Sequence, residues 1–133
     1  MVKKKINARS KGSAGEREFV QWLTSTLLLK KKPTRNLEQV RNGGADIIDL
    51  SPFVFEVKRC EVLKLRDWWA KVCVDTPHDV IPVVAFRQNK KPWNFLISAR
   101  FIGLEKGFIQ LEENKFKEWI KRIYKENNPC NAG

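Results

Sequence analysis

The chain has 133 residues, a formal net charge of +11 and a sequence pI near 9.8. Its length suits one domain with a core of its own, and its 42% hydrophobic content excludes a disordered chain. So strong a positive charge on a small domain favours a polyanionic partner, with nucleic acid as the first candidate and an anionic membrane surface as the second.

The cysteine, histidine and apolar patterns exclude further classes. Three cysteines without a CxxC pair and a single histidine, His78, are too few for a zinc site or a disulfide framework. No segment approaches the roughly 18 to 20 apolar residues that a membrane span needs. The basic N-terminal segment lacks the apolar run of a secretory signal. We therefore expect a soluble intracellular protein with reduced thiols and no membrane partner.

The predicted elements, taken in chain order, are those of an α/β domain. Residues 1–12 form a flexible basic arm, either a solubilising tail or a phosphate contact; residues 13–126 form the single domain, and residues 127–133 a disordered tail. Within the domain we expect helices over 13–30, 65–75 and 112–125, and strands over 34–40, 45–50, 53–60, 80–86 and 93–98. This order indicates a mixed central β-sheet flanked by helices.

The first predicted helix carries a carboxylate on its apolar side. Phe19, Leu23 and Leu27 recur at four-residue spacing, and Glu16 precedes Phe19 by three residues. Glu16 is therefore predicted to face inward, and two interpretations stay open. With Ser13 it fits the S-x-x-E capping box, in which it only satisfies a backbone N–H. Alternatively, it belongs to a buried site.

Two predicted strands, "GADIIDL" and "FVFEVKRC", contain charges where burial is costly. Side chains alternate along a strand, so Glu56 and Lys58 share one face, and Asp46 shares a face with Ile48 and Leu50. Both faces of the second strand carry apolar residues, which predicts a central position in the sheet. If the two strands pair through the intervening "SPF" turn, Asp46 and Glu56 converge at one end of the sheet.

Converging carboxylates repel each other unless a proton or a cation lies between them. Oxygen ligands without histidine favour Mg²⁺, with Mn²⁺ able to substitute. In this interpretation Asp46 and Glu56 are direct ligands, Glu16 binds through water or a second metal, and Lys58 stabilises negative charge during phosphodiester hydrolysis. Asp49, on the opposite strand face from Asp46, is expected to be structural. The alternative is a Glu56–Lys58 pair on a solvated face, since E-x-K alone is common.

Three segments together resemble the PD-(D/E)xK nuclease superfamily, and within it the archaeal-type Holliday junction resolvases and related small phage resolvases. They are "RSKGSAGEREFVQWL", "GGADIIDL…FVFEVK" and "VIPVVAFRQNKKPWNFLI", which span about residues 11–98. The first is similar to the family's opening helix, whose first glutamate corresponds to Glu16. The chain departs from the pattern where "GAD" replaces "PD", and in "RCEVLKLRDWWAKV" after Lys58.

The resemblance implies a restriction-endonuclease-like core and a homodimeric, Mg²⁺-dependent endodeoxyribonuclease that makes paired symmetric nicks in four-way DNA junctions. It implies Glu16, Asp46, Glu56 and Lys58 as catalytic residues, the three acids also holding the metal. It also implies a cytoplasmic location in a prokaryotic cell or a phage-infected host. Contacts with DNA are expected from Lys11, Arg35, Gln39, Arg41 and Arg59. For Arg35, Gln39 and Arg41, a solvated strand face is the alternative.

Two other functions stay open. One is a small nuclease with the same core that cuts flaps, nicks or linear duplex, and the other is a DNA-binding protein without catalysis. A membrane binder would need a sustained basic amphipathic helix, which the sequence lacks. Trp68 and Trp69 are adjacent, and we expect one of them in the core. The other lies in the core as well, or at a dimer interface or a DNA surface. His78 is expected in a loop without a catalytic role.

Overall fold

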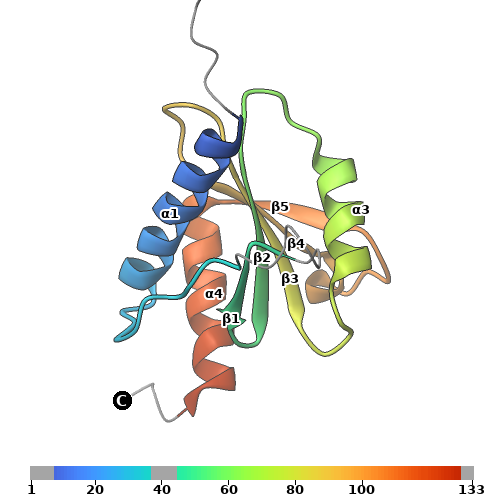
Figure 1. The fold of residues 1–133 in the computed structure, drawn as a ribbon. Coiled ribbons are helices and arrows are strands. Elements are labelled where there is room, and N and C mark those ends of the chain that lie inside the picture. Colours follow the sequence, from blue (N-terminus) through green and yellow to red (C-terminus); the bar gives the residue numbers. More distant parts are fainter. Residues whose placement is uncertain (1–7, 37–44, 130–133) are drawn as a thin grey trace, which may run out of the picture.

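The structure, a computed structural model, describes residues 8–36 and 45–129, with only the backbone for residues 8–13. Its strands form one five-stranded mixed sheet, and three α-helices flank that sheet (Figure 1). The elements in chain order are α1 (Ala8–Thr26), β1 (Ile47–Leu50), β2 (Phe53–Arg59), α3 (Leu65–Asp75), β3 (Ile81–Arg87), β4 (Asn94–Ser98), the 3-10 helix η1 (Ala99–Ile102), β5 (Phe108–Glu112) and α4 (Glu113–Asn127). The α/β class and the mixed sheet are as predicted.

The strands follow one another in space in the order β1-β2-β3-β4-β5. Strands β2 and β3 run parallel, joined by the crossover through α3, and the other neighbours are antiparallel. Strand β2 pairs on both sides, which confirms its predicted central position. Strand β5 is not among the predicted strands, the last of which ends at residue 98. Its pairing with β4 over five residues defines it as a strand.

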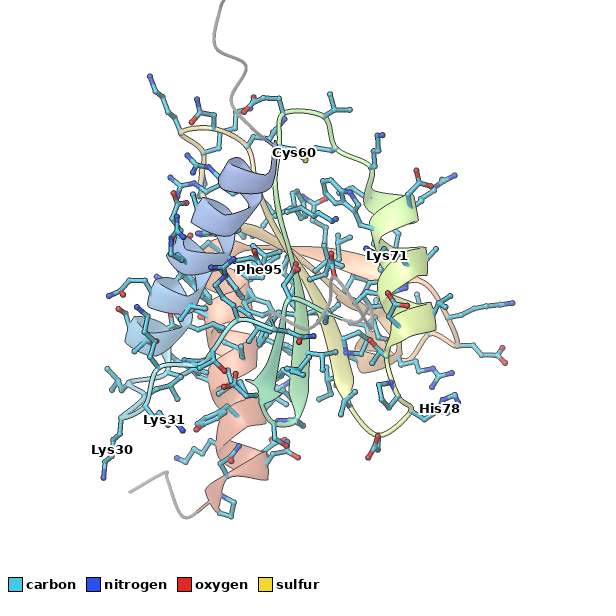
Figure 2. The ribbon with its side chains drawn as sticks, in the orientation of Figure 1. Lys30, Lys31, Cys60, Lys71, His78 and Phe95 are labelled. Carbon is cyan, nitrogen blue, oxygen red and sulfur yellow. The ribbon has the colours of Figure 1, made fainter. Side chains whose placement is uncertain are left out.

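Two apolar clusters hold the layers together on opposite faces of the sheet. On one face, α1 and α4 pack against β2 and β4, with Phe95 of β4 stacked on Phe116 of α4 at 3.7 Å between ring centroids (Figures 1 and 2). On the other face, α3 packs through Trp68, Trp69 and Val72. Both tryptophans are buried, which agrees with a core position for each and not with the alternatives of a dimer interface or a DNA surface for the second.

The first helix differs from its predicted bounds at both ends. It covers Ala8–Thr26 instead of residues 13–30, so residues 8–12, expected in the flexible arm, are helical. Ser13 therefore lies inside the helix, five residues after its start, and cannot cap its N-terminus. This excludes the capping-box interpretation of Glu16, which needed a helix start at Ser13.

The first strand also departs from simple alternation. The β1–β2 ladder shifts register between Ile47 and Leu50. Leu50 is consequently buried in the same cluster as Ile47, while Ile48 is 53% exposed, so the prediction that Leu50 shares a face with Ile48 is wrong. Asp49 accepts hydrogen bonds from the backbone N–H and the hydroxyl of Thr34, at 2.9 and 2.6 Å. It has the structural role that we expected.

The segment before β1 lies beside it over the residues that the structure describes. Arg35 forms an isolated antiparallel bridge with Ile47, and the Asn36 N–H donates to the Asp46 carbonyl at 2.7 Å. Residues 37–44 lie outside the described residues, and they include residues 37–40 of the strand predicted over 34–40. The described helices include none that is long and apolar enough to cross a membrane.

Helix α1 approaches β2 closely at a glycine. A Cβ atom placed on Gly15 would lie 3.0 Å from the Cβ of Arg59, which is tied to the strand backbone and cannot move aside. The absence of a side chain therefore lets the helix approach the strand and sets the depth at which the next residue, Glu16, enters the protein.

We expect Gly15→Val to lower the free energy of unfolding by about 1–3 kcal/mol, because the added methyl groups force α1 away from β2. Chemical denaturation measures this change. Gln21→Val is the matched control, since Gln21 is exposed on the same helix and reports only the cost of β-branching. An equal loss in the two variants would contradict a close approach at Gly15.

Candidate functional site

Three carboxylates are the polar or charged side chains that the described part of the chain buries. Glu16 is 7% exposed, Asp46 is 6% exposed and Glu56 is 4% exposed. They come from α1, from the residue that precedes β1, and from the middle of β2. Burying ionised carboxylates costs several kcal/mol each unless they are paired, so a cluster of three requires a compensating interaction.

Asp46 occupies the centre of this cluster because of how β1 begins. Its backbone N–H donates to the Phe55 carbonyl at 2.8 Å, as in an antiparallel ladder. Its side-chain Oδ2 then accepts a hydrogen bond from the Val57 N–H at 2.7 Å. In a longer β1 strand, a backbone carbonyl would accept this hydrogen bond instead. The carboxylate therefore lies at the edge of β2, between the layer of α1 and the sheet face that carries Glu56.

Glu16 reaches Asp46 from the helical layer. Burial raises the pKa of Glu16, the negative charge of Asp46 raises it further, and Arg35 opposes both effects. The Arg35 Nη2 atom donates to Glu16 Oε2 at 3.3 Å, which is the direct cause of that opposition. Arg35 is held in place by its bridge to Ile47, so the segment before β1 supplies a cation to the cluster.

Glu56 faces Asp46 from the sheet. Burial raises the pKa of Glu56, and the charge of Asp46 raises it further, while Lys58 and Lys71 lower it. Both lysines approach the same atom, Glu56 Oε1, with Nζ at 3.3 Å for Lys58 and 3.9 Å for Lys71. Lys58 lies two residues along the strand from Glu56 and on the same face, which confirms the predicted alternation. Because Glu56 is buried, it does not lie on a solvated face.

Lys71 was not identified from the sequence. It comes from α3 (Figure 2), where helical spacing places it three residues after the buried Trp68. That spacing indicates a position beside the buried stripe of α3. It does not indicate that the stripe lies over β2, because this depends on the crossover from β2 to β3.

The remaining predicted residues are placed as follows. Arg59 donates to Glu18 at 2.8 Å, and Arg87 of β3 donates to the same carboxylate at 3.3 Å. Arg59 therefore helps to join α1 to the sheet and is only partly exposed. The Lys11 side chain, Gln39 and Arg41 lie outside the described residues.

The carboxylates face a backbone hydrogen-bond donor and cationic side chains. In the described part of the chain, no group of three or more histidine, cysteine, aspartate and glutamate side chains is arranged to hold a metal ion. The contacts explain this arrangement, since one Asp46 oxygen accepts a backbone N–H and an oxygen of each glutamate accepts a cation. The donor set itself, three carboxylates without histidine or cysteine, is the one that hard divalent cations prefer.

Comparisons of the chain with protein-family models, with curated proteins and with solved structures find no match. A function is therefore inferred from the geometry of the carboxylate cluster, its cations, the charge of the whole chain and the sequence resemblance.

We expect Glu56→Gln to raise the melting temperature at neutral pH in the presence of EDTA. The raised pKa of Glu56 means that the folded protein binds its proton more tightly than the unfolded chain does. Stability contributed by this group is therefore lost as pH rises from its ordinary pKa of 4.5 through the raised value. Glutamine, a neutral isostere, avoids that loss.

Thermal melting from about pH 4 to about pH 8 measures the effect. The difference in melting temperature between Glu56→Gln and the wild type should become smaller toward the acidic end. Glu118→Gln is the matched control, because Glu118 is exposed on α4. A stabilisation of equal size in that variant would show that burial of Glu56 is not the cause.

Proposed function

We propose that the protein is a metal-dependent, structure-selective DNA endonuclease that resolves four-way junctions. One observation carries the proposal: the three carboxylates that the described chain buries come from three separate elements and meet around Asp46. A structural ion pair needs one carboxylate. Two buried glutamates whose pKa values are both raised by burial and by the charge of Asp46 are typical of a site that binds a cation or transfers protons.

Mg²⁺ is the cation that this site suits best. Asp46 and Glu56 would bind it directly, and Glu16 would bind through water or hold a second ion. When bound, the ion lowers the pKa of a water molecule and neutralises charge on the scissile phosphate. The fit rests on the oxygen-only donors and on the raised pKa of both glutamates, because a nearby divalent cation favours their ionised forms.

The lysines beside Glu56 supply positive charge at the same place. Lys58 has a side chain that is 28% exposed, so its ammonium group is accessible to a phosphate while its stem is held by the strand. It would stabilise the negative charge that develops on the phosphate oxygens during cleavage. Lys71 is 60% exposed and approaches Glu56 from α3, where it would contact the incoming strand.

The choice of substrate follows from charge and from the resemblance described above. A net charge of +11 supports binding to nucleic acid. The similarity of the "GSAGERE" and "FEVKR" segments to the junction resolvases, with their restriction-endonuclease-like core, favours four-way DNA junctions. A homodimer belongs to the same proposal, since paired nicks in a two-fold symmetric junction need two sites and each chain provides one.

A second function, DNA binding without catalysis, is favoured by a specific observation. Arg35, Lys58 and Lys71 already pair with the glutamates of the cluster, so the charges are partly neutralised without a metal. In such a protein the cluster would hold α1, β2 and α3 in register. Cleavage and metal binding distinguish the two candidates.

We expect Asp46→Asn to lower the rate of junction cleavage by a factor on the order of 10² to 10³, because it removes the charge at the centre of the cluster. Junction binding should stay the same or become tighter, since a negative charge near the phosphates is removed. The assay uses a synthetic four-way junction with Mg²⁺ or with EDTA. Linear duplex, flap and single-stranded DNA serve as substrate controls.

Paired symmetric nicks in the junction alone, dependent on Mg²⁺, would support the proposal. Equal cutting of linear duplex would rule out a junction resolvase, and cleavage by Asp46→Asn at the wild-type rate would rule out the metal assignment. Melting in the presence of Mg²⁺ provides a readout besides activity. The ion should raise the melting temperature of the wild type and not that of Asp46→Asn; no rise in either would favour the non-catalytic function.

We expect Lys71→Gln to move the acidic limb of the cleavage profile to higher pH, because Lys71 lowers the pKa of Glu56. An exposed ion pair contributes at most about 1 kcal/mol, so the shift should be less than about one pH unit. Single-turnover cleavage across a pH series measures it. Arg66→Gln removes the same charge from an exposed position of α3, and an equal shift there would assign the effect to net charge.

A further inference from the structure

A basic groove lies between α1 and α4, on the opposite sheet face from α3. It encloses about 520 Å³ and contains three lysines of α4 and no carboxylate. We call it the lysine groove. Its lining residues are Ser25, Thr26, Leu27, Leu28, Lys117, Lys121, Tyr124, Lys125 and Asn128. None of them belongs to the carboxylate cluster.

The three lysines form a row along the helix. Lys117, Lys121 and Lys125 are four residues apart and therefore share one face of α4, spread over roughly 12 Å. Lys117 pairs with Glu113 at 3.9 Å and lies over the Trp22 ring at 5.9 Å. Lys121 and Lys125 are exposed, and no ion pair joins either of them to another residue within the described chain.

A purely structural role accounts for only part of this row. Lysines near the C-terminal end of a helix interact favourably with its dipole, and Lys125 lies in the last turn of α4. Lys121 lies in the middle of the helix, where the dipole has little effect. The like-charged neighbours four residues away on either side also destabilise the isolated helix by a few tenths of a kcal/mol each. The row is therefore not explained by helix stability.

Further lysines line the hollows that adjoin the groove at its two ends, together with Asp49 in one hollow and Glu18 and Glu113 in the other. An adjoining hollow is lined by Lys30, Lys31 and Lys32, which follow α1, and Lys30 and Lys31 extend from the lower left of the molecule (Figure 2). At the other end, a hollow that shares Lys117 is lined by Lys90 and Lys91 of the β3–β4 hairpin.

We propose that the lysine groove binds the phosphate backbone of a nucleic acid, as a second contact surface separate from the carboxylate cluster. One strand of B-DNA places a phosphate about every 3.4 Å along its axis, so the roughly 12 Å lysine row faces three to four phosphates. The hydroxyl groups of Ser25 and Thr26 offer neutral donors in the same groove. The proposal requires DNA binding and does not require that the protein cut DNA.

The test measures binding of a fluorescent four-way junction and of a linear duplex, in EDTA, over a series of salt concentrations. We expect Lys121→Gln combined with Lys125→Gln to weaken binding by a factor on the order of 10 near 0.1 M salt. The slope of log K against log salt should become shallower by about 1.8, or about 0.9 for each phosphate that the variant no longer neutralises. Glutamine preserves helix propensity, and circular dichroism verifies folding.

The matched control combines Lys106→Gln with Lys115→Gln, two exposed lysines that do not line the groove. Both pairs lower the net charge equally, so an equal loss of binding would overturn the proposal, as would no loss in the groove variant. Vesicles of phosphatidylserine and phosphatidylcholine provide a further arm. Weakened vesicle binding with unchanged DNA binding would assign the groove to a membrane surface instead. Because EDTA prevents cleavage, a failure of the nuclease proposal does not affect this measurement.

Discussion

The hydrogen bond from the Val57 N–H to the Asp46 carboxylate is the interaction on which the site depends. It replaces a backbone bond at the point where β1 begins, so the carboxylate is held by the sheet rather than by a loop. Because β2 continues past that point, Glu56 and Lys58 lie beside Asp46 on a strand that is paired on both sides. Helix α1 can approach the same edge because Gly15 has no side chain. The rigid sheet thereby determines the spacing of the charges in the cluster.

Ionising the two glutamates of the cluster is costly. Burial and the charge of Asp46 raise the pKa of Glu16 and Glu56, and the cations beside each glutamate only partly offset this effect. Those cations come from three segments: Arg35 before β1, Lys58 in β2 and Lys71 in α3. Residues selected for stability alone would not accumulate this cost, since an apolar cluster of similar volume is usually at least as stable as a buried ion pair. The energetic cost of burying these carboxylates is therefore an argument that the cluster has a role beyond stability.

Periodicity in the sequence predicts the parts of this arrangement that depend on regular local geometry. It predicts that Glu16 faces inward and that Glu56 and Lys58 share a face, because α1 and β2 are regular where these residues lie. It fails at Leu50, where a register shift interrupts the alternation of β1. It also misses Lys71 and β5, because the placement of α3 over β2 and the pairing of β5 with β4 are tertiary features. Local pattern determines which face a side chain takes, whereas chain topology determines which residue it meets.

The two charged regions lie in different parts of the fold, and this separation constrains the partner. Glu56 and its lysines lie on the α3 side of the sheet, whereas the lysine groove lies between α1 and α4 on the other side (Figure 1). A short straight duplex that contacts one side has no reason to reach the other. A nucleic acid that occupies both has to bend around the sheet edge or carry more than one arm. Together, the two proposals favour a branched or bent nucleic acid as the partner, because they place its contacts on two faces of the sheet.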